Sequence, residues 1–392
     1  MFNNAQDHLF FIHVPKCQGT TLNSLFSASL PAERALTSEQ QDLFSILFSE
    51  ASAMNEYRYI GGHFPNWLHI AKFPNKKLIV VVRDPVKRFN SILKHGFRDV
   101  AFRGHLPELW ETNKPLTVFK NIAKRNLWIN VASAGSYCAS SDLPKFSSVD
   151  GFYEDVFSQI EKFDYLIADT DFDNYFLDFA FKLNMPPIEA APVMRPSANY
   201  ESNTLEFKEV SAKELKKYFP WEFDLYDRVK KKSESQSPVR PKLDVWKKNY
   251  EEYWRTMDRS NFYCFSADMP IKGYGWYPRA NLNLVHIGVH YKYGIKFEGS
   301  GAFVDIPLGP EMKNLRGAIF CEDAGLPQQL KITLNSKSCK INWPISIVKN
   351  VISFSIDLNS ENVGDLYTRV EIEYNGETKI LSDVFLLELL AH

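Results

Sequence analysis

An unbroken run of five apolar residues, Leu78 to Val82, constrains the fold of this chain more than any other feature. A strand without polar alternation is buried on both faces, as in parallel sheets that helices cover on each side. The residues that follow favour a helix, because Asp84 suits the N-cap and Pro85 the first helical position, and apolar residues recur from Val86 at helical spacing. The pattern predicts a buried strand, a short loop and a helix.

Two other segments show the same order of elements. His8 to Val14 (HLFFIHV) is a strand candidate, and a Gly-containing loop and LNSLF follow it. Phe163 to Ala168 (FDYLIA) is another, and the amphipathic stretch DNYFLDFAFKLN follows it. Repeated strand–helix units of this kind predict an α/β domain with a parallel sheet.

The sequence changes character after residue 230. Lys230 to Lys242 (KKKSESQSPVRPK) is charged and Ser/Pro-rich, which is typical of a linker or a mobile loop, and a helical stretch follows from Leu243 to Arg255. Beyond Pro270, short apolar runs separated by turn residues predict a β-sandwich. For 392 residues we expect two domains, at 1–230 and 270–392, with a linker and helical connection at 231–269.

Composition excludes some classes of function. The formal charge of −1, from 46 basic and 47 acidic residues, gives no support for a nucleic-acid scaffold. No run approaches the ~18 apolar residues of a membrane span, and no signal-peptide pattern opens the chain, so we expect a cytoplasmic protein. Scattered cysteines without CxxC spacing predict free thiols and neither a disulfide framework nor a metal site: Cys17, Cys138, Cys264, Cys321 and Cys339.

The loop from Pro15 to Thr21 (PKCQGTT) has the residues of an anion site at a strand-to-helix turn. The start of a helix offers N–H groups and a partial positive charge. Gly19 permits close backbone approach, and Lys16 adds a full charge. Because the lysine precedes the glycine, this is not a Walker loop. The alternative reading is an ordinary strand turn with a solvated lysine.

The second loop runs from Arg83 to Ser91 (RDPVKRFNS). An arginine at the end of a buried strand lies at the edge where open α/β sheets bind ligands. Its planar fork suits a phosphate better than an ammonium does, and Ser91 adds a hydroxyl from the following helix. Taken alone, the RDP sequence also fits an ion-paired turn.

Together the two loops resemble the donor-binding signatures of carbohydrate sulfotransferases, in particular the heparan and chondroitin type. That family uses 3′-phosphoadenosine 5′-phosphosulfate (PAPS); one strand leads into PKTAGTT and a later one into RDPxxRFxS. IHVPKCQGTTL and VVVRDPVKRFNSIL match these in the same order. The resemblance covers residues 8 to 230 and implies a P-loop-like, three-layer domain of the sulfotransferase type.

The resemblance also implies roles for individual residues. Arg83 and Ser91 correspond to residues that hold the 3′-phosphate of the donor. Cys17 and Gln18 belong to the donor-binding loop, where the family usually has a small hydroxyl residue and a small apolar one. The 5′-phosphosulfate is assigned to four residues of that loop: Lys16, Gly19, Thr20 and Thr21.

A third segment, Gly61 to Pro65 (GGHFP), is similar to the segment that carries the catalytic histidine in many of these enzymes. Histidine suits that task because its unperturbed pKa of about 6.5 lets it accept a hydroxyl proton near neutrality, and His63 is the candidate here. A lone histidine is more often structural, and His69 and His95 are competitors, as are His13, which we expect to be buried in the first strand, and His105.

These residues predict an O-sulfotransferase whose acceptor is a hydroxylated glycan and whose donor substrate is PAPS, with no metal required. A metal-dependent nucleotide kinase is one alternative, although it needs an acidic magnesium ligand that the sequence does not clearly offer. A glycan-binding protein with a decayed catalytic domain is the other. In the C-terminal region, we weigh Tyr274, Trp276 and Tyr277 as a sugar platform against a simple core-filling role.

Overall fold

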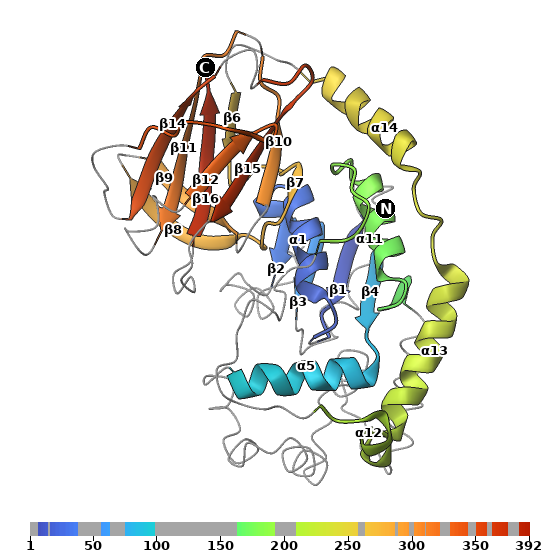
Figure 1. Ribbon diagram of the computed structural model, residues 1–392. Coiled ribbons are helices and arrows are strands. Elements are labelled where there is room, and N and C mark those ends of the chain that lie inside the picture. The colour runs from blue at the N-terminus through green and yellow to red at the C-terminus, as the bar shows by residue number, and fades with distance from the viewer. Residues whose placement is uncertain are drawn as a thin grey trace.

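The computed structural model describes most of the chain. The described residues are 7–14, 16–37, 56–62, 75–98, 163–192, 209–257, 263–286, 289–297, 302–309, 311–321, 330–343, 350–358, 363–374 and 384–392. Within them the protein is an α/β unit with a parallel sheet, joined to a region of antiparallel sheets (Figure 1). The α/β class predicted from sequence is confirmed. None of the described helices is long and apolar enough to cross a membrane.

The first sheet has five parallel strands in the order β2-β3-β1-β4-β5. Residues Leu78 to Val82 of its β4 strand are at most 7 % exposed, so both faces are buried as predicted. The strands are β1 (His8–Ile12), β2 (Ala35–Thr37), β3 (Tyr59–Gly62), β4 (Lys76–Val82) and β5 (Tyr165–Ala168).

Helices cover this sheet. The helices α1 and α11 are neighbours, because the rings of Phe26 and Phe179 lie 5.6 Å apart. On another side α13 packs along β5, where the Ser233 hydroxyl accepts a hydrogen bond from the Ala168 amide at 3.1 Å. The helices among the described residues are α1 (Gly19–Ser29), α5 (Pro85–Arg98), α11 (Phe172–Lys182), α12 (Ala212–Tyr218), α13 (Pro220–Gln236) and α14 (Leu243–Arg255), and a 3-10 turn, η1 (Ala32–Arg34), also lies there.

One predicted element is partly wrong. The charged stretch from Lys230 to Lys242 is predicted as a linker or mobile loop, but α13 continues into it and ends at Gln236. The reason is a buried face: Val229 is 3 % exposed and Ser233 is fully buried. The Ser233 hydroxyl also donates to Asp171 at 2.9 Å, which fixes this end of the helix against the sheet.

The C-terminal region consists of antiparallel strands, which fits the predicted change from helical to strand-rich sequence. One sheet has the order β13-β12-β15-β10-β7, and the other β14-β11-β16-β9-β8, with β6 paired to β16. Both contribute side chains to one hydrophobic cluster. The strands are β6 (Tyr263–Ser266), β7 (Gly273–Tyr274), β8 (Ala280–His286), β9 (Val289–Lys296), β10 (Ala302–Ile306), β11 (Asn314–Cys321), β12 (Leu330–Leu334), β13 (Lys337–Ser338), β14 (Val351–Asp357), β15 (Thr368–Tyr374) and β16 (Val384–Ala391).

The aromatic segment weighed as a sugar platform is buried. Tyr274 is 6 %, Trp276 1 % and Tyr277 5 % exposed, so the core-filling alternative holds for these rings. The Tyr274 hydroxyl donates to the Pro186 carbonyl at 2.8 Å, and its ring lies 6.2 Å from that of Phe176 on α11. The segment therefore fills the boundary between the two parts of the protein.

Lys272 lies at the same boundary. Its ammonium donates to the Leu183 carbonyl at 3.0 Å and lies 4.8 Å from the centre of the Tyr253 ring. Burial lowers the pKa of Lys272 to about 8. A charged amine in this position therefore carries a desolvation cost that its contacts only partly offset.

We predict a pH dependence of stability from this lysine. Between about pH 8 and the ordinary lysine pKa of 10.5, the unfolded chain holds the Lys272 proton and the folded protein does not. Rising pH therefore stabilises the folded state, by at most about 1.4 kcal/mol per pH unit. Urea unfolding from pH 7.5 to 9.5 measures the free energy of unfolding of the wild type and of Lys272→Met. The wild-type value minus the variant value should increase as the pH rises. The exposed Lys248→Met control should differ from wild type by a constant amount; a constant difference for Lys272→Met would contradict the prediction.

Candidate functional site

The loop after β1 forms a tight turn before α1. Lys16 and Gln18 both have left-handed backbone angles, φ 64° and 56°, and the Cys17 amide donates to the Val14 carbonyl at 3.3 Å. A left-handed conformation costs roughly 1–2 kcal/mol for a residue with a side chain. Gln18 is the N-cap of α1, and its side chain makes no capping hydrogen bond. The first turn of α1 thus depends on other groups to pair its N–H groups.

Gly19 is required here by its neighbour His13. A Cβ atom at position 19 would lie 1.9 Å from Cδ2 of the His13 ring, so only glycine fits without moving that ring. The ring stacks on Phe11 at 5.6 Å, and the His13 amide donates to the Gly62 carbonyl at 3.0 Å. His13 is 9 % exposed, which confirms the predicted burial. The His13 ring thus packs between Phe11 and Gly19.

The two threonines of the loop lie in different surroundings. Thr20 is half-buried at the start of α1. The Thr21 hydroxyl instead donates to the Pro192 carbonyl at 3.4 Å, and Thr21 lines a small cavity beside Tyr274 and Trp276. Of the two hydroxyls that the resemblance assigns to the donor, the Thr20 hydroxyl is therefore the better placed.

The second loop meets the first. Arg83 follows the last residue of β4, and its Nη1 donates to the Lys16 carbonyl at 3.3 Å. The parallel pairing of β1 with β4, with Ile12 beside Val80, brings the carboxyl ends of the two strands together. Asp84 caps the following helix as predicted, because its Oδ1 accepts from the Lys87 amide at 2.9 Å. Ser91 is half-buried in the second turn of α5.

A buried charge pair stands behind these loops. Arg88 is 4 % and Glu222 7 % exposed, and Nη1 of the arginine lies 3.9 Å from Oε2 of the glutamate. Sequence reasoning missed this pair, because Glu222 lies on α13, which no local motif links to α5. With Arg83, the pair lines a cavity whose other walls are Val14, Val82, Leu225 and Tyr226.

Asp169, directly after β5, organises the same edge. Its Oδ1 accepts hydrogen bonds from the Tyr226 hydroxyl at 2.7 Å and from the Asp84 amide at 3.2 Å. Lys87 lies 3.8 Å from Oδ2. Burial, together with the hydrogen bond to this carboxylate, raises the pKa of Tyr226, so the phenol keeps its proton and donates. Three strand ends, of β1, β4 and β5, are thus held in one polar network.

The thiol of Cys17 sits on the protein side of the loop. It is 1 % exposed, and burial raises its pKa to about 11 despite the nearby positive charges of Arg88 and Arg83. The side chain therefore packs as a neutral thiol under the loop. The four cysteines in the described part of the chain are free thiols, as predicted: Cys17, Cys264, Cys321 and Cys339.

Several predicted residues lie outside the described part of the chain. His63, the candidate base, directly follows the last residue of β3, and it is one of these, as are His69 and His105. His95 lies in α5, but its side chain is not described. No group of three metal-ligating side chains forms a cluster among the residues that are described.

A comparison of the sequence with models of known protein families gave no match, and no curated protein matches it either. The motifs of the two loops and the GGHFP segment are thus what carry the resemblance to the sulfotransferases.

We predict that Cys17 is protected from alkylation. Iodoacetamide at pH 8 should modify Cys264, which is exposed, and leave Cys17 unmodified in the folded protein, because the thiolate is the reactive form and Cys17 is a buried neutral thiol. Peptide mass spectrometry over a time course gives both rates in one sample. In 8 M urea both should react at similar rates. Modification of Cys17 as fast as Cys264 in the folded protein would show that the loop does not cover it.

Proposed function

We propose that this protein transfers the sulfuryl group of PAPS to a hydroxyl group of a glycan. The contact between Arg83 Nη1 and the Lys16 carbonyl is the observation that supports it most, since it joins the two loops whose motifs resemble the donor-binding signatures. Within this proposal the parallel sheet is of the P-loop-like sulfotransferase type. The two antiparallel sheets then form an appended β-sandwich.

The chemistry asks for charge stabilisation and alignment. The bond between sulfur and the bridging oxygen of the donor breaks, and a bond between sulfur and the acceptor oxygen forms. Negative charge then grows on the departing phosphate oxygen, as in phosphoryl transfer. We assign Lys16 to that oxygen, because an ammonium group stabilises it as it leaves. The acceptor must also lose its hydroxyl proton, which we assign to His63.

The nucleotide needs separate anchors. Arg83 and Ser91 hold the 3′-phosphate in this proposal, and the start of α1, at Gly19 and Thr20, holds the 5′-phosphosulfate. The Asp169–Tyr226 hydrogen bond keeps the β5 end in place beside Asp84, so that the second loop is rigid before the nucleotide binds. A site arranged in advance loses less entropy on binding.

We predict that the product nucleotide stabilises the protein and that its 3′-phosphate is required. Adenosine 3′,5′-bisphosphate should raise the melting temperature, since a ligand at 100 times its Kd stabilises the folded state by about 2.7 kcal/mol. Adenosine 5′-monophosphate should give a much smaller shift. Arg83→Ala should remove most of the difference between the two nucleotides, and the exposed Arg255→Ala should keep it. Equal shifts in melting temperature from both nucleotides in the wild type would contradict the assignment of Arg83 and Ser91 to the 3′-phosphate.

A second prediction separates binding from chemistry. His63→Ala should lower kcat by roughly 10²- to 10⁴-fold, the usual contribution of a general base, with the Kd for adenosine 3′,5′-bisphosphate nearly unchanged. Lys16→Ala should lower kcat and weaken nucleotide binding as well. His290→Ala, on the exposed part of β9, is the control and should behave as wild type. Normal turnover by His63→Ala would transfer the base assignment to His69 or His95.

A further inference from the structure

The C-terminal end of α1 is capped by the antiparallel region. The last four carbonyls of a helix have no partner within it. Arg279, which is 1 % exposed, donates from Nη1 to the Ser27 carbonyl, and the Ile271 amide donates to the Ala28 carbonyl at 2.6 Å. The guanidinium also donates to the Ala267 and Met269 carbonyls. The cation lies where it complements the negative end of the helix dipole.

The residues after α11 are held in the same way. Three carbonyls beyond the end of this helix accept hydrogen bonds from side chains of α14 and the segment beside β7. The pairs are Lys272 Nζ with Leu183 at 3.0 Å, Trp246 Nε1 with Met185 at 2.9 Å, and the Tyr274 hydroxyl with Pro186 at 2.8 Å. The end of α1 and the chain that leaves α11 are thus both held by the C-terminal part of the protein.

Both helices start at the candidate site. α1 begins at Gly19, in the first loop, and α11 begins at Phe172, three residues after Asp169. Each helix runs back along the parallel sheet, so its C-terminal end lies near the amino ends of the strands, away from the candidate site. Figure 1 shows this arrangement: β4 points towards α5, and the antiparallel sheets lie at the other end of the parallel sheet. The C-terminal region therefore reaches the site through the helices.

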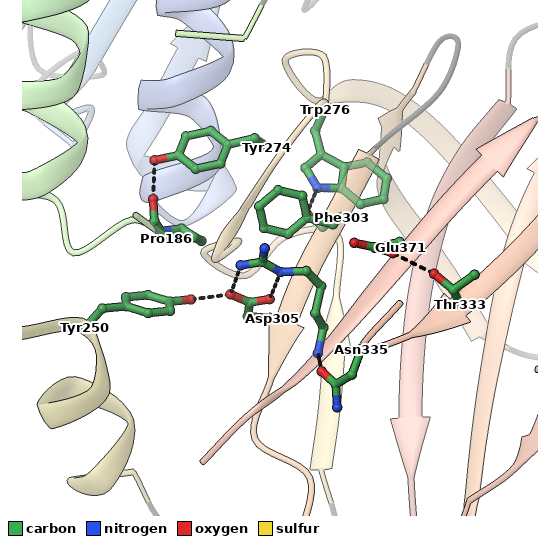
Figure 2. A network of polar contacts seen from close by, with 10 residues as sticks. Pro186, Tyr250, Tyr274, Trp276, Phe303, Asp305, Thr333, Asn335 and Glu371 are labelled. Atoms are coloured by element: carbon green, nitrogen blue, oxygen red, sulfur yellow. Dashed lines mark hydrogen bonds and ion pairs between the residues drawn. The ribbon is translucent and has the colours of Figure 1, made fainter. Parts of the chain in front are cut away.

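The sheet beside the capping segment is held by a second polar network. Figure 2 shows Asp305 of β10 beside Tyr250 of α14, whose hydroxyl donates to this carboxylate at 2.8 Å. The Arg369 guanidinium of β15 donates to the same carboxylate at 2.8 and 2.9 Å. The Arg369 guanidinium lies 3.9 Å from the centre of the Phe303 ring, and the Phe303 carbonyl accepts from Trp276 Nε1 at 2.6 Å. These contacts tie β10 to α14, to β15 and to Trp276, whereas the contacts of Arg279 with α1 are a separate set.

We infer that Arg279 is a positioning residue for the donor site, acting through α1 from the far side of the sheet. Eleven residues form this helix, a rigid rod of about 16 Å at 1.5 Å per residue. A shift at its capped end moves Gly19 and Thr20, and contacts to a phosphosulfate tolerate displacements of only about 0.5 Å. The identity of the ligand in this inference rests on the proposed function. The coupling between Arg279 and the start of α1 does not.

The inference implies that the C-terminal region is needed for a well-ordered donor site. If the C-terminal region were an independent accessory domain, a fragment ending near Lys232 would bind the nucleotide as the whole protein does. With its Ser27, Ala28, Leu183 and Pro186 carbonyls uncapped, that fragment lacks the contacts that hold both helices. The full-length protein is therefore the right material for the test.

The test compares Arg279→Lys with Tyr250→Phe in the full-length protein. Tyr250→Phe removes a buried hydrogen bond to Asp305 in the same region without touching α1. We expect Arg279→Lys to weaken binding of adenosine 3′,5′-bisphosphate about tenfold by calorimetry, and Tyr250→Phe to change it less than twofold at the same loss of melting temperature. Arg279→Met should weaken it further. Equal effects of Arg279→Lys and Tyr250→Phe, or no effect of either, would overturn the inference.

Hydrogen exchange separates this claim from the proposed function. Amides of Gly19 to Thr21 should exchange faster in Arg279→Lys than in Tyr250→Phe, whether or not any nucleotide binds. If the wild-type protein fails to bind adenosine 3′,5′-bisphosphate, the proposed function falls and the exchange rates alone decide the inference. Should Arg279→Lys not fold, Lys272→Met gives the same comparison at α11, where the amides after Asp171 should exchange faster. Unchanged exchange at these helix starts would overturn it.

Discussion

The pairing of β1 with β4 is the constraint on which the rest of the candidate site depends. The two strands are parallel, with His8 beside Lys76 and Ile12 beside Val80. The loops that follow them therefore leave the sheet side by side, at the carboxyl ends of the strands. The Arg83–Lys16 hydrogen bond is a consequence of that register. A shift of two residues in this register would move Arg83 about 7 Å along the strand axis, well beyond hydrogen-bonding range of the Lys16 carbonyl.

The site is supported from two directions. At the carboxyl edge, Asp169, Tyr226 and the Arg88–Glu222 pair hold the loops from the side of α13. At the other edge, Arg279 and Lys272 hold the far ends of α1 and α11. Buried charges are costly unless they are paired or hydrogen-bonded. Asp169, Arg279 and Lys272 are all hydrogen-bonded, and Arg88 faces Glu222.

Local patterns predicted much of the fold and part of the site. The strands β1, β4 and β5 are long apolar runs followed by helix signals, and the meeting of the two loops follows from parallel pairing alone. The strand β3 was missed, because YIGG is short and half glycine. The end of α13 was misjudged, because its composition is that of a linker and the buried contacts of Ser233 leave no mark in the local sequence. Local patterns do not predict the roles of Glu222, Tyr226 and Arg279 for the same reason, because their partners are distant in the chain.

Transfer of label from sulfur-labelled PAPS is the most direct test of the central claim. The protein would be incubated with a panel of hydroxylated polysaccharides, with EDTA present to remove divalent metals, and label would be counted in the polymer. The proposal predicts label in at least one polysaccharide, with one adenosine 3′,5′-bisphosphate formed for each sulfuryl group transferred, and loss of both in Lys16→Ala. Turnover that requires Mg²⁺ and consumes ATP would favour a kinase. Absence of both PAPS binding and PAPS consumption would contradict the account.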